Sequence, residues 1–198
     1  MSTLTGALAT PHVLATEAGM AAFADGGNAI DAALAAAAVL TVVYPHNVAL
    51  GGDLIALVRR PDGVIRCINA SGWSGRDSTA ALMRERHGRA LPVRGADTVT
   101  VPGGVRGWKM LRDFGARLSW ARTLGPAQRA AADGVPVAES LARHIADPEN
   151  TDLHDVEDFA GVFRPGGVGL GVADRLVQPR LANTLAALCA DGPDAFYT

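Results

Sequence analysis

The sequence has few of the residues on which several common protein classes depend. Cysteine occurs only at Cys67 and Cys189, which is too few for a disulfide framework, so we expect two ordinary buried or half-buried thiols. The most apolar run covers residues 32–44, well short of the roughly 20 residues that a membrane-spanning helix needs. We therefore expect neither a disulfide-stabilised scaffold nor a protein that crosses a membrane.

The charged residues give no sign of a polyanionic partner. Lys109 is the only lysine among 18 basic residues, and 20 acidic residues bring the formal net charge to −2. Proteins that bind nucleic acid or an anionic membrane surface usually carry a clustered basic excess, so we expect neither partner. The five histidines show no spacing typical of metal ligands, and no metal site is expected.

Signatures of several frequent enzyme classes are also missing. No G-K-S/T sequence is present, which excludes a P-loop, and no G-x-S-x-G marks an α/β-hydrolase nucleophile. The glycines of residues 167–171 lack the spacing of a dinucleotide-binding turn. The N-terminal residues do not combine a basic segment with an apolar one, so we expect no secretory signal and a cytoplasmic protein.

What the sequence does contain is typical of one well-packed globular domain. Hydrophobic residues make up 48% and charged residues 19%, a balance that supports a buried core and argues against disorder. The length suits a single large domain, and neither an internal repeat nor a linker divides the chain. We therefore predict one domain spanning residues 1–198.

The N-terminal third predicts two helices separated by a glycine turn. Apolar residues recur at helical spacing over residues 11–25, where Gly26 and Gly27 end the pattern. Asn28 can cap the next helix, and Asp31 lies in its first turn, where a carboxylate favours the helix dipole. Alanine and leucine fill residues 29–43 before Pro45. Such small residues indicate a buried helix packed closely against a sheet.

The rest of the chain predicts a β-hairpin followed mainly by helices. Two apolar strands, residues 54–58 and 64–68, flank the turn sequence Pro61-Asp62-Gly63. Further helices are predicted over residues 78–86, 105–114, 121–132, 137–145 and 180–190, with a brief strand at 99–101 and an acidic loop at 147–158. The predicted elements therefore give an α+β fold.

Five short blocks occur in the order found in one known family. They are Gly26–Asp31; Pro45-His46 with Leu50-Gly51-Gly52; residues 101–107 (V-P-G-G-V-R-G); residues 125–137 (G-P-A…A-D-G-V-P-V); and residues 178–197 (Q-P-R-L-A…D-A-F-Y). Each block alone is weak evidence, but five in order are specific. On these blocks the chain resembles the γ-glutamyltranspeptidase family, a branch of the N-terminal-nucleophile hydrolases.

The resemblance implies a fold and a chemistry. The implied fold is the αββα four-layer sandwich, of which this chain would supply part of the large subunit. In the family an autoprocessing precursor cuts itself, and the small subunit then begins with a threonine that attacks a small-molecule amide. That threonine's own α-amino group acts as the base, and an oxyanion hole stabilises the intermediate. No cofactor is implied.

The family's cleavage motif, Thr-Thr-His, does not occur in this sequence. We therefore expect no catalytic residue in this chain and a partner chain carrying the threonine nucleophile, as a heterodimer. An inactive isolated fragment is the other explanation. We favour the heterodimer, because a fragment lacking half of its sandwich would expose apolar sheet faces.

A second departure concerns substrate recognition. The resemblance implies an arginine after the second strand, just before an Ala-Pro pair, that binds the substrate's α-carboxylate. The corresponding position falls at about Ser71 or Gly72, and Ser74-Gly75 stands where Ala-Pro is expected. Arg76 is either a late substitute or a surface arginine that pairs with Asp77 or with nothing. A bidentate arginine is hard to replace, so altered acyl specificity is expected.

Four residues around this segment are the candidate substrate-binding residues: Asp53, Trp73, Ser74 and Arg76. Trp73 either lines an apolar acyl pocket or packs beneath its loop. Asp53 either faces the site or stabilises a turn. For His46 we expect a buried, hydrogen-bonded side chain and no catalytic role.

The predicted function is therefore that of a γ-glutamyltranspeptidase-like amide hydrolase or acyltransferase with altered acyl specificity. A non-catalytic relative that keeps the fold as a binding or structural scaffold is the alternative. The nature of the partner chain separates the two, because only an enzyme needs one that starts with threonine, serine or cysteine.

Overall fold

A computed structural model of the chain describes residues 6–197. The prediction that no secretory signal is present was based on the first residues of the chain. Most of these residues lie outside the described range. The chain divides into two compact units, one formed by residues 1–49 and 112–198 and the other by Leu50–Leu111. Among the described helices, none is long and apolar enough to cross a membrane.

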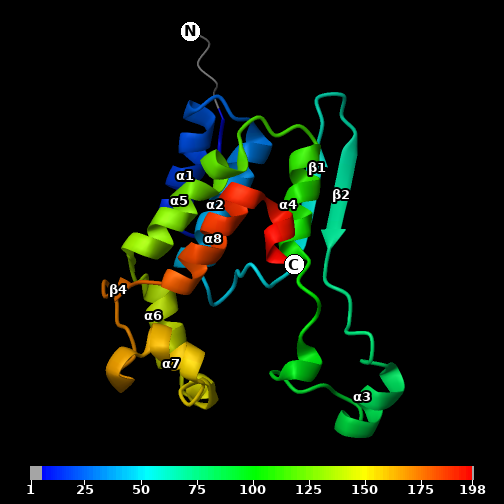
Figure 1. Ribbon diagram of the computed structural model, residues 1–198, viewed down its shortest axis with the longest axis vertical. Helices are drawn as coiled ribbons and strands as arrows, with labels where there is room; N and C mark the ends of the chain where they lie inside the picture. Colours follow the sequence, from blue (N-terminus) through cyan, green and yellow to red (C-terminus); the bar gives the residue numbers. More distant parts are fainter. Residues whose placement is uncertain (1–5, 198) are drawn as a thin grey trace. The chain divides into compact units, whose positions relative to one another are not determined.

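The described chain contains both helices and strands (Figure 1). The α-helices are α1 Val13–Ala24, α2 Ala29–Val43, α3 Ala80–His87, α4 Gly104–Asp113, α5 Trp120–Asp133, α6 Glu139–Ala146, α7 Glu157–Phe163 and α8 Pro179–Asp191. The strands are β1 Leu54–Arg59, β2 Ile65–Ala70, β3 Val135–Pro136 and β4 Arg175–Leu176. Short 3₁₀ turns are Ala96–Thr98, Pro148–Leu153, Pro165–Gly167 and Pro193–Phe196.

The start of α2 confirms the capping predicted from the sequence. The Asn28 side-chain oxygen accepts hydrogen bonds from the backbone N–H groups of Ile30 (2.9 Å) and Asp31 (3.3 Å), while the Asn28 N–H donates to Asp31 (2.9 Å). This reciprocal pair is a capping box, which satisfies donors that the first helical turn leaves free. Gly26, with φ of +87°, lies between α1 and the cap, in a conformation that glycine adopts readily.

The alanine-rich helix α2 lies in the core of the first unit, beside α1 and α5 (Figure 1). Among the described elements its main packing partners are therefore helices, where the sequence predicted a sheet. Close packing requires small side chains: a Cβ atom on Gly19 of α1 would lie 2.9 Å from the backbone oxygen of Ala32. Ala32, Ala35, Ala36 and Ala38 are buried, but Ala33 is exposed and Ala37 half-buried. The helix is therefore buried around most of its circumference and open only along a narrow stripe that includes Ala33.

Replacing Ala36 with leucine should destabilise the protein by roughly 1–3 kcal/mol, because three additional carbon atoms must fit where only 3% of the residue is exposed. Ala33→Leu, on the exposed face of the same helix, is the matched control and should leave stability nearly unchanged. Thermal melts of the two variants compare them directly. Equal melting temperatures would show that α2 tolerates extra volume on its buried face.

The C-terminal part of the first unit packs helices through a buried leucine-rich core. Leu124 of α5 and Leu185 and Leu188 of α8 are fully buried, and α5 and α8 lie side by side (Figure 1). The buried Gln178 side chain donates to the backbone oxygen of Val42 (2.9 Å). That bond satisfies one of the free carbonyl groups at the end of α2 and joins residues far apart in sequence.

The second unit is built on the antiparallel hairpin of β1 and β2. Leu54 pairs with Ala70 and Arg59 with Ile65, and the turn passes through Gly63, with φ of +85°. Helix α4 packs closely on one face, since a Cβ atom on Gly107 would lie 2.7–2.8 Å from side-chain atoms of Leu54 and Ala70. Trp108, on the next position of α4, is buried.

The other face of this hairpin is exposed and mostly apolar, with Arg59 and Asn69 at its two ends. Ile55, Leu57 and Ile65 are 69%, 73% and 62% exposed, and the register places Cys67 opposite Leu57 on the same face. Cys67 is therefore exposed, and the expectation of a buried or half-buried thiol was wrong for this residue. Cys189 is half-buried, and burial raises the pKa of its thiol.

Three other differences from the predicted elements have local causes. Residues 99–101 are not a strand, although they are β-branched, because one backbone bond from Val101 to Trp73 does not make a ladder. Helix α7 lies in and after the predicted acidic loop and is too short to show a period. Strands β3 and β4 have two residues each, which gives no alternation to detect.

Candidate functional site

Three segments of the second unit meet around the predicted substrate-binding residues: the turn at residues 51–53, the loop after β2 at residues 71–79, and residues 99–104 before and at the start of α4. The Asp53 carboxylate accepts the Gly72 N–H at 3.0 Å. The Trp73 carbonyl accepts the Val101 N–H at 2.8 Å, and the Gly52 carbonyl accepts the Gly104 N–H at 2.8 Å. Each segment is thus bonded to at least one of the others.

Glycines allow these segments to approach closely. A Cβ atom on Gly72 would lie 1.9 Å from the Val101 carbonyl oxygen, and one on Gly103 would lie 2.0 Å from that of Ala70. No real side chain tolerates such distances, so both positions require glycine. In the sequence, residues 101–107 were recognised only as a family block. The glycines of this block are the signal that could have predicted the close approach of the backbone segments.

The Trp73 side chain projects away from this framework. It is 86% exposed, so the interpretation that it packs beneath its loop was wrong. Ser74 and Arg76 are exposed as well, and within the described part of the chain their side chains have no hydrogen-bond or ion-pair partner. Arg76 is thus not paired with Asp77. Of the four predicted substrate-binding residues, only Asp53 is tied into the protein by its side chain.

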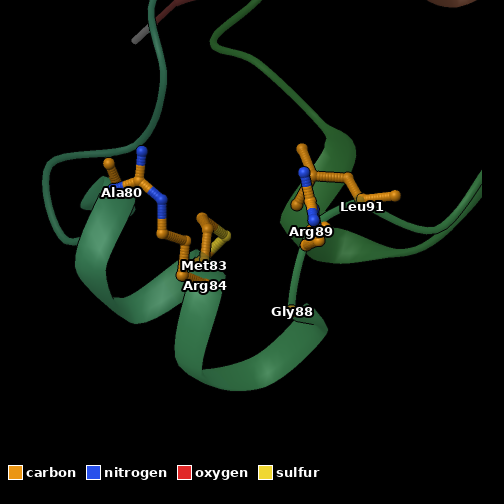
Figure 2. Close-up of a pocket in the computed structure, with 7 residues that line it drawn as sticks. Ala80, Met83, Arg84, Gly88, Arg89 and Leu91 are labelled. Atoms are coloured by element: carbon orange, nitrogen blue, oxygen red, sulfur yellow. The ribbon is translucent and has the colours of Figure 1, made fainter.

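The loop leads into α3, which carries a basic hollow that no pattern in the sequence predicted. Ala80, Met83 and Arg84 of α3 face Arg89 and Leu91 across a space of about 200 Å³ (Figure 2). At the end of α3, Arg86 and His87 both contact Asp97, at 3.0 and 2.8 Å. The hydrogen bond from His87, aided by Arg86, lowers the pKa of the Asp97 carboxyl.

In the first unit, His46 lines a separate hollow of about 250 Å³ together with His144, Phe159 and Phe163. The two imidazole rings stack with centroids 5.3 Å apart, and the Tyr44 ring lies 4.3 Å from that of His46. The Nδ1 atom of His46 is buried without a hydrogen-bond partner in the described chain. The prediction that the His46 side chain is hydrogen-bonded was therefore wrong. Burial, and then the neighbouring His144, lower the pKa of His46.

Comparison with known proteins finds relatives whose names describe them as proenzymes. Residues 15–198 match the family described as gamma-glutamyltranspeptidase. The glutathione hydrolase-like YwrD proenzyme of Bacillus subtilis is 38% identical over 192 residues, covering 95% of this chain and 36% of that protein. The oxamate amidohydrolase proenzyme of Klebsiella pneumoniae is 39% identical over 198 residues, covering 97% and 37%. This chain therefore spans little more than a third of these relatives.

The solved structures agree with the sequence matches. The crystal structure of Helicobacter pylori gamma-glutamyltranspeptidase superimposes with a TM-score of 0.91 at 25% identity, covering 100% of this chain and 58% of that one. The structure thus confirms the predicted N-terminal-nucleophile hydrolase fold, in its large-subunit part. On the family match over nearly its whole length, its relatives and its fold, the chain belongs to the γ-glutamyltranspeptidase family.

Proposed function

We propose that the complete protein is an amide hydrolase or acyltransferase that works through an acyl-enzyme on a threonine held by a separate chain. The observation that carries this proposal is membership of the γ-glutamyltranspeptidase family, together with relatives named as proenzymes. The Thr-Thr-His cleavage motif is absent from these 198 residues. We propose that the nucleophile lies outside these 198 residues, on a separate chain.

A threonine at a chain terminus suits this chemistry. Its hydroxyl is a weak nucleophile at neutral pH, but the adjacent α-amino group, with an ordinary pKa near 7.7–8.0, can remove the proton. Attack on the amide carbon releases the amine and leaves the acyl group on the threonine. Water or an acceptor amine then removes the acyl group, and oxyanion-hole donors stabilise both tetrahedral intermediates.

The exposed hairpin face supports a partner chain. Ile55, Leu57 and Ile65 form an apolar surface on a hairpin whose other face carries α4. Contiguous exposed apolar surface usually marks an interaction site. In an αββα sandwich a second sheet covers such a face, and we propose that the partner chain contributes to it.

The protein, purified in active form, should yield two polypeptides on a denaturing gel. The partner should begin with threonine, serine or cysteine, because only these residues combine a side-chain nucleophile with the terminal amine. N-terminal sequencing or intact-mass measurement identifies that residue. A single active species of 198 residues would refute the two-chain proposal, and a two-chain complex without amide turnover would support the scaffold alternative.

We also propose that the acyl specificity differs from that of γ-glutamyl enzymes. Ser71 and Gly72 stand about where the resemblance implies a carboxylate-binding arginine. The exposed side chains of Trp73, Ser74 and Arg76 follow at once, and we propose that they contact the acyl group. Two relatives with nearly equal identity to this chain carry the names glutathione hydrolase-like and oxamate amidohydrolase. These different names support the proposal that the acyl group varies among these proteins.

The complete enzyme should favour a neutral acyl anilide over a γ-glutamyl anilide. A lost charged hydrogen bond to a carboxylate is worth roughly 1.5–3 kcal/mol, or about one to two decades in kcat/KM. Comparing kcat/KM for the two anilides measures the effect. Preference for the γ-glutamyl compound would contradict the proposal, and Arg76→Ala would then show whether Arg76 has taken over carboxylate binding.

A further inference from the structure

We propose that Asp53 is a positioning residue that holds the loop bearing Trp73 in place by accepting the Gly72 N–H. This inference rests on the proposed function, in which Trp73, Ser74 and Arg76 contact the acyl group. The hydrogen bond is 3.0 Å long and joins residues 19 apart in sequence. Asp53 therefore influences the proposed acyl-binding side chains indirectly, through its bond to the backbone of Gly72.

Gly72 is held from two sides. The Val101 carbonyl oxygen lies so close that a Cβ atom on Gly72 would be 1.9 Å from it, and the Asp53 carboxylate binds the Gly72 N–H. The next backbone acceptor, the Trp73 carbonyl, is fixed by the Val101 N–H at 2.8 Å. The peptide group before Gly72 and the one after Trp73 are thus each bonded to another segment.

This arrangement explains how an exposed side chain can have a defined position. The Trp73 indole is 86% exposed, so little packing holds it, and its placement depends on the backbone that carries it. A binding group works best when its support is rigid before the ligand arrives. Loss of the Asp53 bond to Gly72 would leave the bond between Trp73 and Val101 to hold this part of the loop.

The Asp53 turn is itself anchored. The Gly52 carbonyl accepts the Gly104 N–H at 2.8 Å, and the close approach of Gly104 to Gly52 leaves a Cβ atom on Gly104 only 3.0 Å from the same oxygen. Asp53 thus lies on a turn that is bonded to the start of α4, and its hydrogen bond to Gly72 connects the loop after β2 to this turn. Among the described residues, the Gly72 N–H is the only hydrogen-bonded partner of the Asp53 side chain.

Because one acceptor oxygen is enough for this role, the charge of Asp53 is not needed. Asp53→Asn keeps an oxygen that can accept the Gly72 N–H, whereas Asp53→Ala removes it. A carboxylate that contacted substrate by its charge would be sensitive to both substitutions. The pair of variants therefore separates a positioning role from direct binding.

The matched control is Asp62→Ala. Asp62 is another exposed turn aspartate of the same hairpin, and its carboxylate accepts the Val64 N–H at 3.0 Å. It lies at the opposite end of the strands from Asp53, because Arg59 pairs with Ile65 there and Leu54 pairs with Ala70 near Asp53. Asp62→Ala thus removes a comparable turn bond away from the Trp73 loop.

The experiment uses the complete two-chain enzyme with each substitution in turn. Amide hydrogen exchange is measured by mass spectrometry on peptides covering residues 70–74, and KM and kcat are measured with the preferred anilide. Asp53→Ala should speed exchange at Gly72 and raise KM, each by about five- to tenfold, the size expected for one lost hydrogen bond. Its kcat should stay within about twofold, since the nucleophile is on the other chain. Asp53→Asn and Asp62→Ala should resemble the wild type in both measurements.

Unchanged exchange at Gly72 in Asp53→Ala would overturn the inference, whatever the activity. A rise in KM for Asp53→Asn as large as for Asp53→Ala would also overturn it and assign Asp53 to substrate binding by charge. A wild-type complex that cleaves no amide would refute the proposed function, while faster exchange confined to Asp53→Ala would still support the positioning of the loop.

Discussion

Asp31→Ala is expected to lower the free energy of unfolding by about 3–5 kcal/mol, because it leaves three backbone N–H groups without their acceptor. The Asp31 carboxylate is completely buried. It accepts hydrogen bonds from Asn28 at 2.9 Å, from Arg117 at 3.0 and 3.1 Å, and from Leu118 at 3.0 Å. Chemical denaturation of the complete protein measures the change.

The size of this effect comes from tertiary bonds as well as from capping. The sequence predicts only the cap on α2, and a lost cap costs about 1 kcal/mol. The bonds to Arg117 and Leu118 tie the start of α2 to the segment before α5, and the Asn28 amide adds a bond to the Gly115 carbonyl at 2.7 Å. Asn28→Ala should therefore destabilise the protein less than Asp31→Ala.

Asp25→Ala is the control for Asp31. Asp25 follows α1 and pairs with Arg122 at the surface, where ion pairs contribute little. Its removal should change stability far less than removal of Asp31. Asp31→Asn should recover only part of the loss, because its amide group presents donors to backbone N–H groups. If Asp31→Ala and Asp25→Ala had similar stabilities, the structural role of Asp31 would be refuted.

Gly72→Ala should lower kcat/KM for amide cleavage by about 10- to 100-fold, because small displacements of a binding loop have effects of this size. The new Cβ atom would lie 1.9 Å from the Val101 carbonyl oxygen and 2.5 Å from the Thr100 hydroxyl. The loop must move to relieve the contact, and the bonds to Asp53 and Val101 would be strained or lost. Steady-state kinetics of the complete enzyme with the preferred anilide measure the loss.

Gly51→Ala is the matched control for this steric effect. Gly51 lies in the turn before Asp53, and a Cβ atom there would meet no atom within 4 Å. The same Gly-to-Ala change should therefore leave kcat/KM near the wild-type value. Equal losses in both variants would mean that chain flexibility in general, and not the contact with Val101, determines the activity.

Much of the secondary structure follows from local sequence. The helix bounds of α2 were predicted without error because Asn28 and Asp31 form a cap from residues three apart, and Pro45 cannot continue the helix. The β1–β2 hairpin follows equally from its turn residues and two apolar runs. Short elements such as α7 and β3 contain too few residues to show a period.

The family was also within reach of the sequence alone. Five ordered blocks identified it, because glycines, prolines and small residues mark places where the backbone leaves no room for change. The Thr-Thr-His motif of the family does not occur in these 198 residues, and this absence led to the prediction of a partner chain.

The arrangement of the candidate site depended on tertiary structure. Only the structure shows that the Asp53 carboxylate lies 3.0 Å from the Gly72 nitrogen and that Trp73 is 86% exposed; the substrate-binding roles of both residues remain predictions. Residues 19 to 52 positions apart meet there through single hydrogen bonds, which leave no periodic pattern in a sequence. Likewise, the bond from Gln178 to Val42 joins residues 136 apart. Local sequence determined which elements form and which family the chain belongs to, whereas long-range packing decided which polar groups meet, because that depends on how the elements are brought together in space.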